Sequence, residues 1–172
     1  MQDNEELWQL FQADQREHNR TDDQIVDLST VSAKDIDRLD RVKQLYREGK
    51  IRTGADYFYA ALILQHSHDS IEDYLLAHEF CVASIIKGYN RARWLAAATE
   101  DRFLISQGHP QRFGTQYRLD DEGGWQLYDV DPNVTDSLRQ SMDVPTLEQA
   151  RSRETRPRWW PRFGGDDRFS LN

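Results

Sequence analysis

DYFYAALILQH, residues 56–66, is apolar on nearly every side when it is drawn as a helix. The segment Thr53-Gly-Ala-Asp56 in front of it has the spacing of an N-terminal capping box, which places the start of that helix. A helix that lacks a polar face is buried on most of its sides. We therefore predict that residues 56–66 form the central helix, and that Gln65 and His66 bring polar groups to the centre of the fold.

Two helices are predicted before the central one. The first covers Glu5–His18, in which apolar residues recur at helical spacing. The second begins at the capping box Ser32–Asp35 and ends at Gly49. Its expected inner face consists of Ile36, Leu39, Val42, Leu45 and Tyr46.

Two more helices are predicted after the central one. They begin at the N-cap residues Ser70 and Asn90, and the first of them closes at Lys87-Gly88. This first helix is expected to bury an apolar stripe that also includes His78. The stripe consists of Ile71, Tyr74, Leu75, Val82, Ile85 and Ile86. The short connection and the small residues at the crossing are similar to one helical hairpin of a tetratricopeptide-type repeat, although one hairpin is not an array.

The pattern changes from helical to strand-like in the C-terminal part. Residues 113–119 (FGTQYRL) and 125–130 (WQLYDV) flank Asp120–Gly124, which predicts a β-hairpin. We therefore predict a mainly α fold: a compact helical bundle with a tetratricopeptide-like helical hairpin and a small C-terminal β-hairpin. Residues 1–150 are expected to form a single helical domain, and residues 151–172 an Arg/Trp/Pro-rich tail.

Composition and charge narrow the classes of function. The chain has 172 residues and a net charge of -8, which disfavours binding of nucleic acid or of an anionic membrane by its body. It contains no apolar run long enough to cross a bilayer, and its acidic start is unlike a signal peptide, so we expect a cytoplasmic protein. Cys81, the single cysteine, is predicted to be an inert buried thiol.

Polar residues interrupt the apolar faces of the predicted helices. They are Asp14, Gln65, His66, His78 and Asp101, together with the adjacent Arg102. Burying such groups without partners costs on the order of 1–3 kcal/mol each, and more when they are charged. One interpretation is a structural network in which Arg102 pairs with Asp14 or Asp101. The other is a pocket in which His66 is a general base and Asp14 or Asp101 orients it.

Established catalytic and metal-binding motifs are missing from the sequence. It contains no GxSxG elbow, no Walker loop and no GxGxxG fingerprint, and one cysteine cannot form a CxxC metal knuckle. His66 and His78 offer metal ligands, but their spacing matches no established signature. We therefore predict no cofactor, and a metal at His66 and His78 is the lesser alternative.

The segment QRFGTQ, residues 111–116, is the second informative group of polar residues. Gly114 permits a close backbone approach or a positive φ angle at this point. The side chains of Gln111, Thr115 and Gln116 can either bind the donors and acceptors of a ligand or satisfy the backbone where helix gives way to hairpin. The sequence leaves both interpretations open.

Several of these segments together resemble an uncharacterised bacterial family that is known only as a domain of unknown function. They are QH at residues 65–66, WLAAATEDR at residues 94–102 and QRFGTQ, within a resemblance that extends from about Leu10 to Pro145. The matching positions are Asp14, Gln15, Gln65, His66, Asp101, Arg102, Gln111, Gly114, Thr115 and Gln116. The resemblance implies a group of residues but no activity, and Glu100 and the tail depart from the family pattern.

Two hypotheses about function follow. The first is a small-molecule or peptide-binding domain that can act as a hydrolase, with His66, Asp14 and Asp101 as catalytic residues. Its expected substrate-binding residues are Gln15, Gln65, Arg102, Gln111, Thr115 and Gln116. The alternative is a non-enzymatic adaptor or immunity-type protein-binding module, in which the tail with Trp159-Trp160 either docks on the acidic body or contacts a partner protein.

Overall fold

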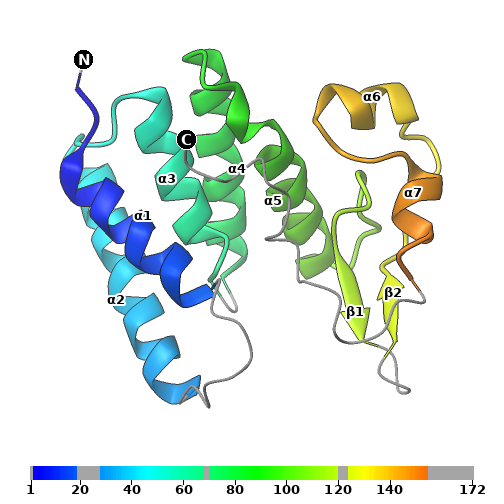
Figure 1. Ribbon diagram of the computed structural model, residues 1–172, viewed down its shortest axis with the longest axis horizontal. Coiled ribbons are helices and arrows are strands. Elements are labelled where there is room, and N and C mark those ends of the chain that lie inside the picture. The colour runs from blue at the N-terminus through cyan, green and yellow to red at the C-terminus, as the bar shows by residue number, and fades with distance from the viewer. Residues whose placement is uncertain (1, 19–27, 68–69, 120–123, 155–172) are drawn as a thin grey trace.

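The computed structural model describes residues 2–18, 28–67, 70–119 and 124–154, with the backbone alone for residues 18 and 28–32 (Figure 1). Within these residues the chain is mainly helical, with a two-stranded antiparallel sheet near its C-terminal end. The elements are α1 (Glu5–His18), α2 (Leu28–Arg47), α3 (Gly54–Leu64), α4 (Ile71–Ile86), the 3-10 turn η1 (Asn90–Ala92), α5 (Arg93–Ser106), β1 (Tyr117–Leu119), β2 (Trp125–Leu127), α6 (Asp136–Ser141) and α7 (Leu147–Arg151). The predicted mainly α bundle with a C-terminal β-hairpin is confirmed.

α3 lies at the centre of the helical part. α1, α2 and α4 all pack against α3, and α5 pairs with α4 as a helical hairpin. The β-hairpin, α6 and α7 lie beyond α5, at the opposite end of the molecule from α1 and α2 (Figure 1). The largest apolar side chains that are fully buried are Leu7, Val42, Leu45, Phe58, Ile63, Leu64 and Leu95.

The start of α3 is fixed by the predicted capping box. The Thr53 hydroxyl accepts from the Asp56 backbone N–H, and the buried Asp56 carboxylate accepts from the Thr53 N–H. The same carboxylate accepts from the Asn4 N–H across 2.7 Å, which ties the beginning of α1 to α3. Gly54 is required here because a Cβ would lie 2.7 Å from the Cβ of Tyr89.

α2 differs from the prediction in its start and in its inner face. It begins at Leu28 rather than at the Ser32–Asp35 box. A capping-box sequence can also lie inside a helix that begins before it, so the pattern does not by itself fix the first residue. Leu39, Val42 and Leu45 are buried as predicted, but Ile36 and Tyr46 are 55% and 46% exposed. The buried face is therefore narrower than the sequence pattern indicates, since α2 lies at the edge of the bundle.

α4 buries a different face from the predicted one. Its buried residues are Asp73, Ala77, Phe80, Cys81 and Ser84, whereas Ile71, Leu75, Val82 and Ile86 are exposed. The small side chains of Ala77 and Ser84 allow α4 to approach α3 closely, and the Ser84 hydroxyl donates to the Gly54 carbonyl across 2.6 Å. Close packing of the small-residue face wins over burial of the larger aliphatic side chains on the other face.

The start of α5 is a second correction. The predicted N-cap Asn90 instead begins the 3-10 turn η1, and no side chain caps either η1 or α5. Two of the small residues of α5, Ala97 and Ala98, are fully buried, as expected for a close crossing.

The C-terminal part follows the predicted hairpin closely. β1 pairs with β2 in an antiparallel register in which Tyr117 lies opposite Leu127 and Leu119 opposite Trp125. Two short helices then follow, and each begins at a threonine N-cap, Thr135 for α6 and Thr146 for α7. The Arg/Trp/Pro-rich tail lies outside the described residues from residue 155 onward.

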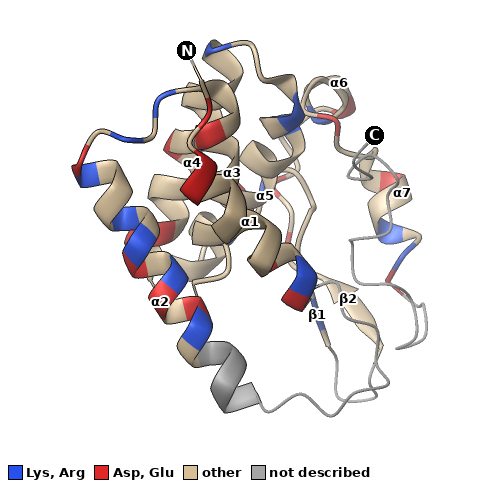
Figure 2. Cartoon of the chain, turned by 60° about the vertical axis from the view of Figure 1, so that its left-hand side comes forward, with Lys and Arg blue, Asp and Glu red and all other residues tan. Residues whose placement is uncertain are grey.

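Charged residues of both signs line the exposed face of α2, and acidic residues begin α1 (Figure 2). No helix of the described residues combines the length and the apolar character that crossing a bilayer requires.

Candidate functional site

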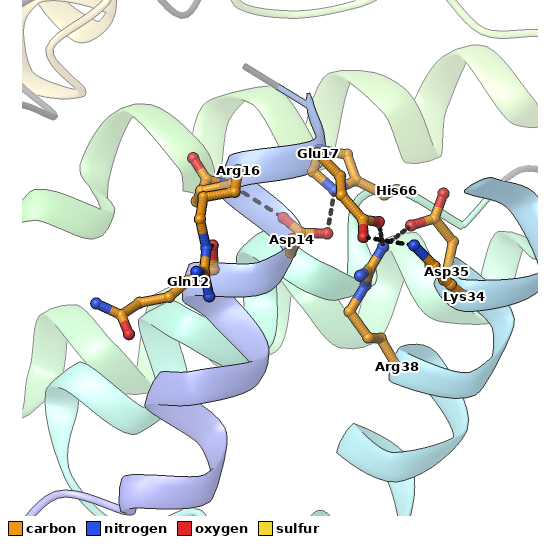
Figure 3. Close-up of polar contacts among 9 residues, drawn as sticks. Gln12, Asp14, Arg16, Glu17, Lys34, Asp35, Arg38 and His66 are labelled. Atoms are coloured by element: carbon orange, nitrogen blue, oxygen red, sulfur yellow. Dashed lines mark hydrogen bonds and ion pairs between the residues drawn. The ribbon is translucent and has the colours of Figure 1, made fainter. Parts of the chain in front are cut away.

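Asp14 and His66 meet where α1 passes the end of α3. Nδ1 of His66 lies 3.0 Å from Oδ1 of Asp14, and the two residues are far apart in the sequence (Figure 3). The Asp14 side chain is 1% exposed and the His66 side chain 18% exposed. A buried carboxylate therefore holds a partly accessible imidazole, as predicted for one of the two possible partners of His66.

The chemistry of this contact fixes the position of a proton. An ionised carboxylate only accepts hydrogen bonds, so a contact with ionised Asp14 requires the proton of the neutral ring to be on Nδ1 of His66, which then donates a hydrogen bond to Asp14. In the neutral ring Nε2 then has the lone pair. This is the tautomer that a general base needs, with a carboxylate placed to stabilise the imidazolium form.

Gln15 completes the contacts of the carboxylate. Its side-chain Nε2 donates to Oδ2 of Asp14 across 3.0 Å, so each oxygen of Asp14 accepts a hydrogen bond from a neighbouring side chain. Gln15 was predicted to bind substrate, and the structure places it as a residue that orients Asp14.

A charged cluster lies next to the Asp14–His66 pair. Arg38 on α2 is 6% exposed, and its Nη2 lies 2.6 Å from both Glu17 on α1 and Asp35 (Figure 3). Lys34 adds a second ion pair to Glu17 at 3.2 Å. The cluster joins α1 to α2, and the positive charge of Arg38 also acts on Asp14.

Glu17 gives this cluster a predictable pH dependence. The hydrogen bond from Arg38 lowers the pKa of the Glu17 carboxyl below its ordinary value, and Lys34 adds to this effect against the opposing effect of burial. Because the folded state then binds the proton more weakly than the unfolded chain, the free energy of unfolding should fall as pH falls through the range in which an ordinary glutamate is protonated. Urea denaturation at several pH values would measure it.

Glu17→Gln is the matched variant for that measurement. It should be less stable than the parent at neutral pH, and the difference should shrink as pH falls because the parent loses the same ion pairs. Glu148→Gln, which changes an exposed carboxyl, should run parallel to the parent at every pH. A constant gap between the parent and Glu17→Gln would contradict the assignment.

Arg102 reaches the same end of α3 from α5. Its Nη1 donates to the Gln65 carbonyl oxygen across 3.4 Å. Its Nε is buried without a hydrogen-bond partner among the described residues, which also provide no carboxylate for an ion pair. Burial lowers the pKa of the Arg102 guanidinium, and the neighbouring Tyr74 hydroxyl opposes this effect. Arg102 is thus a largely desolvated cation without an anion, beside the residue that precedes His66.

Asp101 does not join this group, although it was predicted as the alternative partner of His66 and Arg102. Its fully buried carboxylate accepts four hydrogen bonds from the segment after α5. The donors are the backbone N–H groups of Arg112, Phe113 and Thr115 and the Thr115 hydroxyl, at 2.7–3.0 Å. Burial raises the pKa of the Asp101 carboxyl, and these hydrogen bonds oppose that. Asp101 therefore holds the 112–115 segment.

The other predicted binding residues of the QRFGTQ segment are also engaged with the protein. Nε2 of the buried Gln111 donates to the Gln116 and Tyr128 carbonyls at 3.0 Å, and its Oε1 accepts from the Gln116 N–H. The Gln116 side chain donates to the Thr115 hydroxyl oxygen. Gly114 has a φ angle of 78°, the positive value that the sequence suggested. These contacts favour the interpretation in which the segment satisfies its own backbone.

His78 and Cys81 have local partners within the bundle. Nδ1 of His78 donates to the Ala96 carbonyl across 3.0 Å, which joins α4 to α5. No group of three or more metal-ligating side chains occurs among the residues that the structure describes, so the metal alternative at His66 and His78 gains no support. Cys81 is fully buried, and burial raises the pKa of its thiol, in agreement with an inert cysteine.

A shallow groove of about 350 Å³ runs between α1 and α2 beside the charged cluster. It is lined by Glu6, Gln9, Leu10, Ala13, Lys34, Asp37 and Arg38. Sequence analysis missed Arg38 because its charged partner Glu17 lies on another helix, at no fixed spacing in the sequence. Only the acid three residues before it, Asp35, could have pointed to a paired arginine.

Comparison with known proteins identifies no relative of this chain. No family model matches it, and neither the curated proteins nor the solved structures contain a match. The resemblance to the uncharacterised bacterial family stays a prediction.

Proposed function

We propose that the chain binds a small molecule or peptide with an anionic group at the end of α3, and that the Asp14–His66 pair acts on it as a hydrolase. The observation that carries this proposal is the contact between the buried carboxylate of Asp14 and His66, in which Oδ1 of Asp14 lies 3.0 Å from Nδ1 of His66 and is placed to accept a hydrogen bond from it. In this role Nε2 of His66 takes a proton from a water molecule, and Asp14 stabilises the imidazolium that forms.

Arg102 supports an anionic ligand. A desolvated guanidinium is costly unless an anion pairs with it, and the described residues supply a long hydrogen bond to the Gln65 carbonyl and the neighbouring Tyr74 hydroxyl, while Nε stays without a partner. Arg102 and His66 approach the same end of α3, so an anion bound by Arg102 would be held close to the base. Asp101, Gln111, Thr115 and Gln116 have no part in this proposal because their hydrogen bonds stay within the C-terminal segment.

The state of His66 can be tested without a known substrate. Nitrogen-15 NMR of the imidazole should find the Nδ1-protonated tautomer in the parent protein, because Asp14 can only accept. Asp14→Asn should shift the ring toward a mixture of tautomers while Gln15→Ala changes it little. An Nε2-protonated ring in the parent would remove the base from the proposal.

The anion can be tested with acetate and inorganic phosphate as probes. Either probe should raise the thermal midpoint of the parent, since a ligand that binds only the folded state stabilises it. Arg102→Met should lose this response while its own stability stays equal to that of the parent or rises by about 1 kcal/mol, because an unpaired buried cation is replaced by an apolar chain of similar length. Arg112→Met removes an exposed arginine side chain and should keep the response.

Two results would count against the anion site. The proposal fails if Arg102→Met is strongly destabilised and the parent shows no response to either probe, since Arg102 would then serve only the end of α3. It also fails if Arg102→Met and Arg112→Met respond equally.

The alternative of a non-enzymatic adaptor or immunity-type module stays a prediction. Pull-downs with and without residues 151–172 would test whether the tail contacts a partner protein.

A further inference from the structure

One face of α4 carries two exposed aliphatic side chains in each half of the helix. Ile71, Leu75 and Val82 are 36%, 41% and 40% exposed, and Ile86 is 80% exposed. At about 3.6 residues per turn, the four side chains lie within roughly 60° of each other around the helix. We call Ile71, Leu75, Val82 and Ile86 the α4 stripe. Exposed aliphatic side chains gathered on one helix face in this way are typical of an interaction surface.

The positions of the α4 stripe are symmetric about the midpoint of the helix. Ile71 and Ile86 are the first and last residues of α4, so they lie equally far from its midpoint. Leu75 and Val82 are likewise placed symmetrically about that midpoint, which falls between residues 78 and 79. A surface with this symmetry is complementary to a second copy of itself when the two copies run antiparallel.

We propose that α4 pairs with α4 of a second copy of this chain, antiparallel about a two-fold axis that passes between residues 78 and 79. In this arrangement Ile71 packs against Ile86 of the second copy, and Leu75 packs against Val82 of the second copy. The buried face of α4 already packs on α3, so both faces of the helix become covered. The inference does not depend on the Asp14–His66 site.

The charged residues beside the stripe agree with this arrangement at its ends. A two-fold axis of this kind brings the same flank of both helices together. Glu72 at one end of α4 then lies near Lys87 of the second copy, and this contact forms twice. Near the axis, however, Glu79 faces Glu79 of the second copy. The opposite charges at the ends of the two helices should therefore favour the dimer, and the like charges near the axis should oppose it.

The size of the stripe sets the expected strength. Four aliphatic side chains per copy on one helix make a smaller contact than the interface of a stable dimer. We therefore expect a weak dimer whose population rises with protein concentration. This predicted concentration dependence separates pairing of two copies from coverage of the stripe by another segment of the same chain.

Sedimentation velocity over a range of concentrations would test the dimer with the full chain. Val82→Glu places a charge within the stripe and should raise the dissociation constant of the dimer by roughly tenfold or more. Ile36→Glu is the matched control, since Ile36 is an exposed isoleucine of α2 outside the stripe and its change should leave dimerisation unaltered. A parent that stays monomeric at every concentration overturns the proposal, whether another segment or nothing covers the stripe.

Cysteine trapping would test the orientation. The positions of Leu75 in the two copies are separated by roughly 10 Å along the axis, which exceeds the reach of a disulfide, whereas Leu75 lies opposite Val82 of the second copy. Under mild oxidation a mixture of Leu75→Cys and Val82→Cys proteins should give the mixed dimer rather than either homodimer. The native Cys81 is fully buried and serves as the unreactive background. Preferred Leu75→Cys homodimers would overturn the antiparallel register.

Charge variants beside the stripe are expected to change the strength of the dimer in both directions. Glu79→Gln removes a like-charge contact at the axis and should strengthen the dimer, while Lys87→Glu should weaken it by placing a second acid near Glu72. In a parallel pairing the flanks of the two helices exchange, and Glu79 would lie near His78 of the second copy instead. Weakening by Glu79→Gln would therefore overturn the proposed arrangement even if a dimer forms.

Discussion

Asp101→Ala is expected to lower the free energy of unfolding by about 4 kcal/mol, one of the two largest effects predicted for this chain. The substitution leaves four donors of the 112–115 segment without an acceptor, three of them buried. Each such group costs about 1–3 kcal/mol, and relaxation of the segment keeps the total below the simple sum. Urea denaturation gives the change, and amide exchange at Arg112, Phe113 and Thr115 should accelerate together.

Two variants separate this effect from a general loss of charge. Thr115→Val removes one donor of the four and should cost about 1 kcal/mol. Glu100→Ala removes the neighbouring, partly exposed carboxyl and should change stability by about 0.5 kcal/mol or less. If Asp101→Ala costs no more than Glu100→Ala, the carboxylate does not hold the segment.

The same substitution also separates the two clusters that sequence analysis had joined. The Asp101 carboxylate accepts its hydrogen bonds from the 112–115 segment, whereas Nδ1 of His66 contacts Asp14, so the milder Asp101→Asn should leave the Nδ1-protonated state of His66 unchanged below its unfolding temperature. A catalytic role of Asp101 through His66, as first predicted, would instead require the imidazole to respond.

The fold could be predicted where local patterns decide it. The Thr53–Asp56 box, the Ser70 N-cap and the hairpin across residues 120–124 are formed by residues close together in sequence, and all three are found. The inner face of α4 could not be predicted, because Ala77 and Ser84 pack against α3 through a shape that only the partner helix defines. A prediction based on hydrophobicity alone therefore assigns the wrong face of α4 to the core.

The site could be predicted only as a set of candidates. An acid in an apolar stripe shows that a partner exists but not which one, and Asp14 and Asp101 looked alike in the sequence. Asp14 is satisfied by side chains, His66 and Gln15, whereas Asp101 is satisfied almost entirely by backbone N–H groups. Nearly every residue type has a backbone N–H, so a sequence pattern cannot show which backbone groups will donate to a buried acid.

Arg139→Met is the other substitution with a large expected effect, a loss of about 3–4 kcal/mol. The Arg139 side chain is 2% exposed, and its guanidinium donates to the carbonyl oxygens of Arg112, Phe113 and Val134. Its single ionic partner among the described residues, Asp136, is half exposed and 3.4 Å away. Methionine fills similar space but leaves three carbonyl acceptors without this donor, those of Phe113 and Val134 in buried hydrogen bonds. Urea denaturation measures the loss, with the exposed Arg151→Met as control.

Arg139→Lys distinguishes charge from geometry. Lysine keeps the positive charge but cannot direct several N–H groups to carbonyls on both sides of a planar fork, so it should recover less than half of the loss. Full recovery would show that the charge alone matters, through Asp136, and would contradict the role assigned to the three carbonyls.

Arg139 and Asp101 bind opposite groups of the same backbone, which predicts how their substitutions combine. Asp101 accepts from the N–H groups of Arg112 and Phe113, and Arg139 donates to the carbonyls of the same two residues. Once one of them is removed and the segment detaches, the other has little left to hold. The double variant should therefore lose at least about 1 kcal/mol less than the sum of the single losses. Additive losses would mean that the two residues stabilise separate parts of the fold.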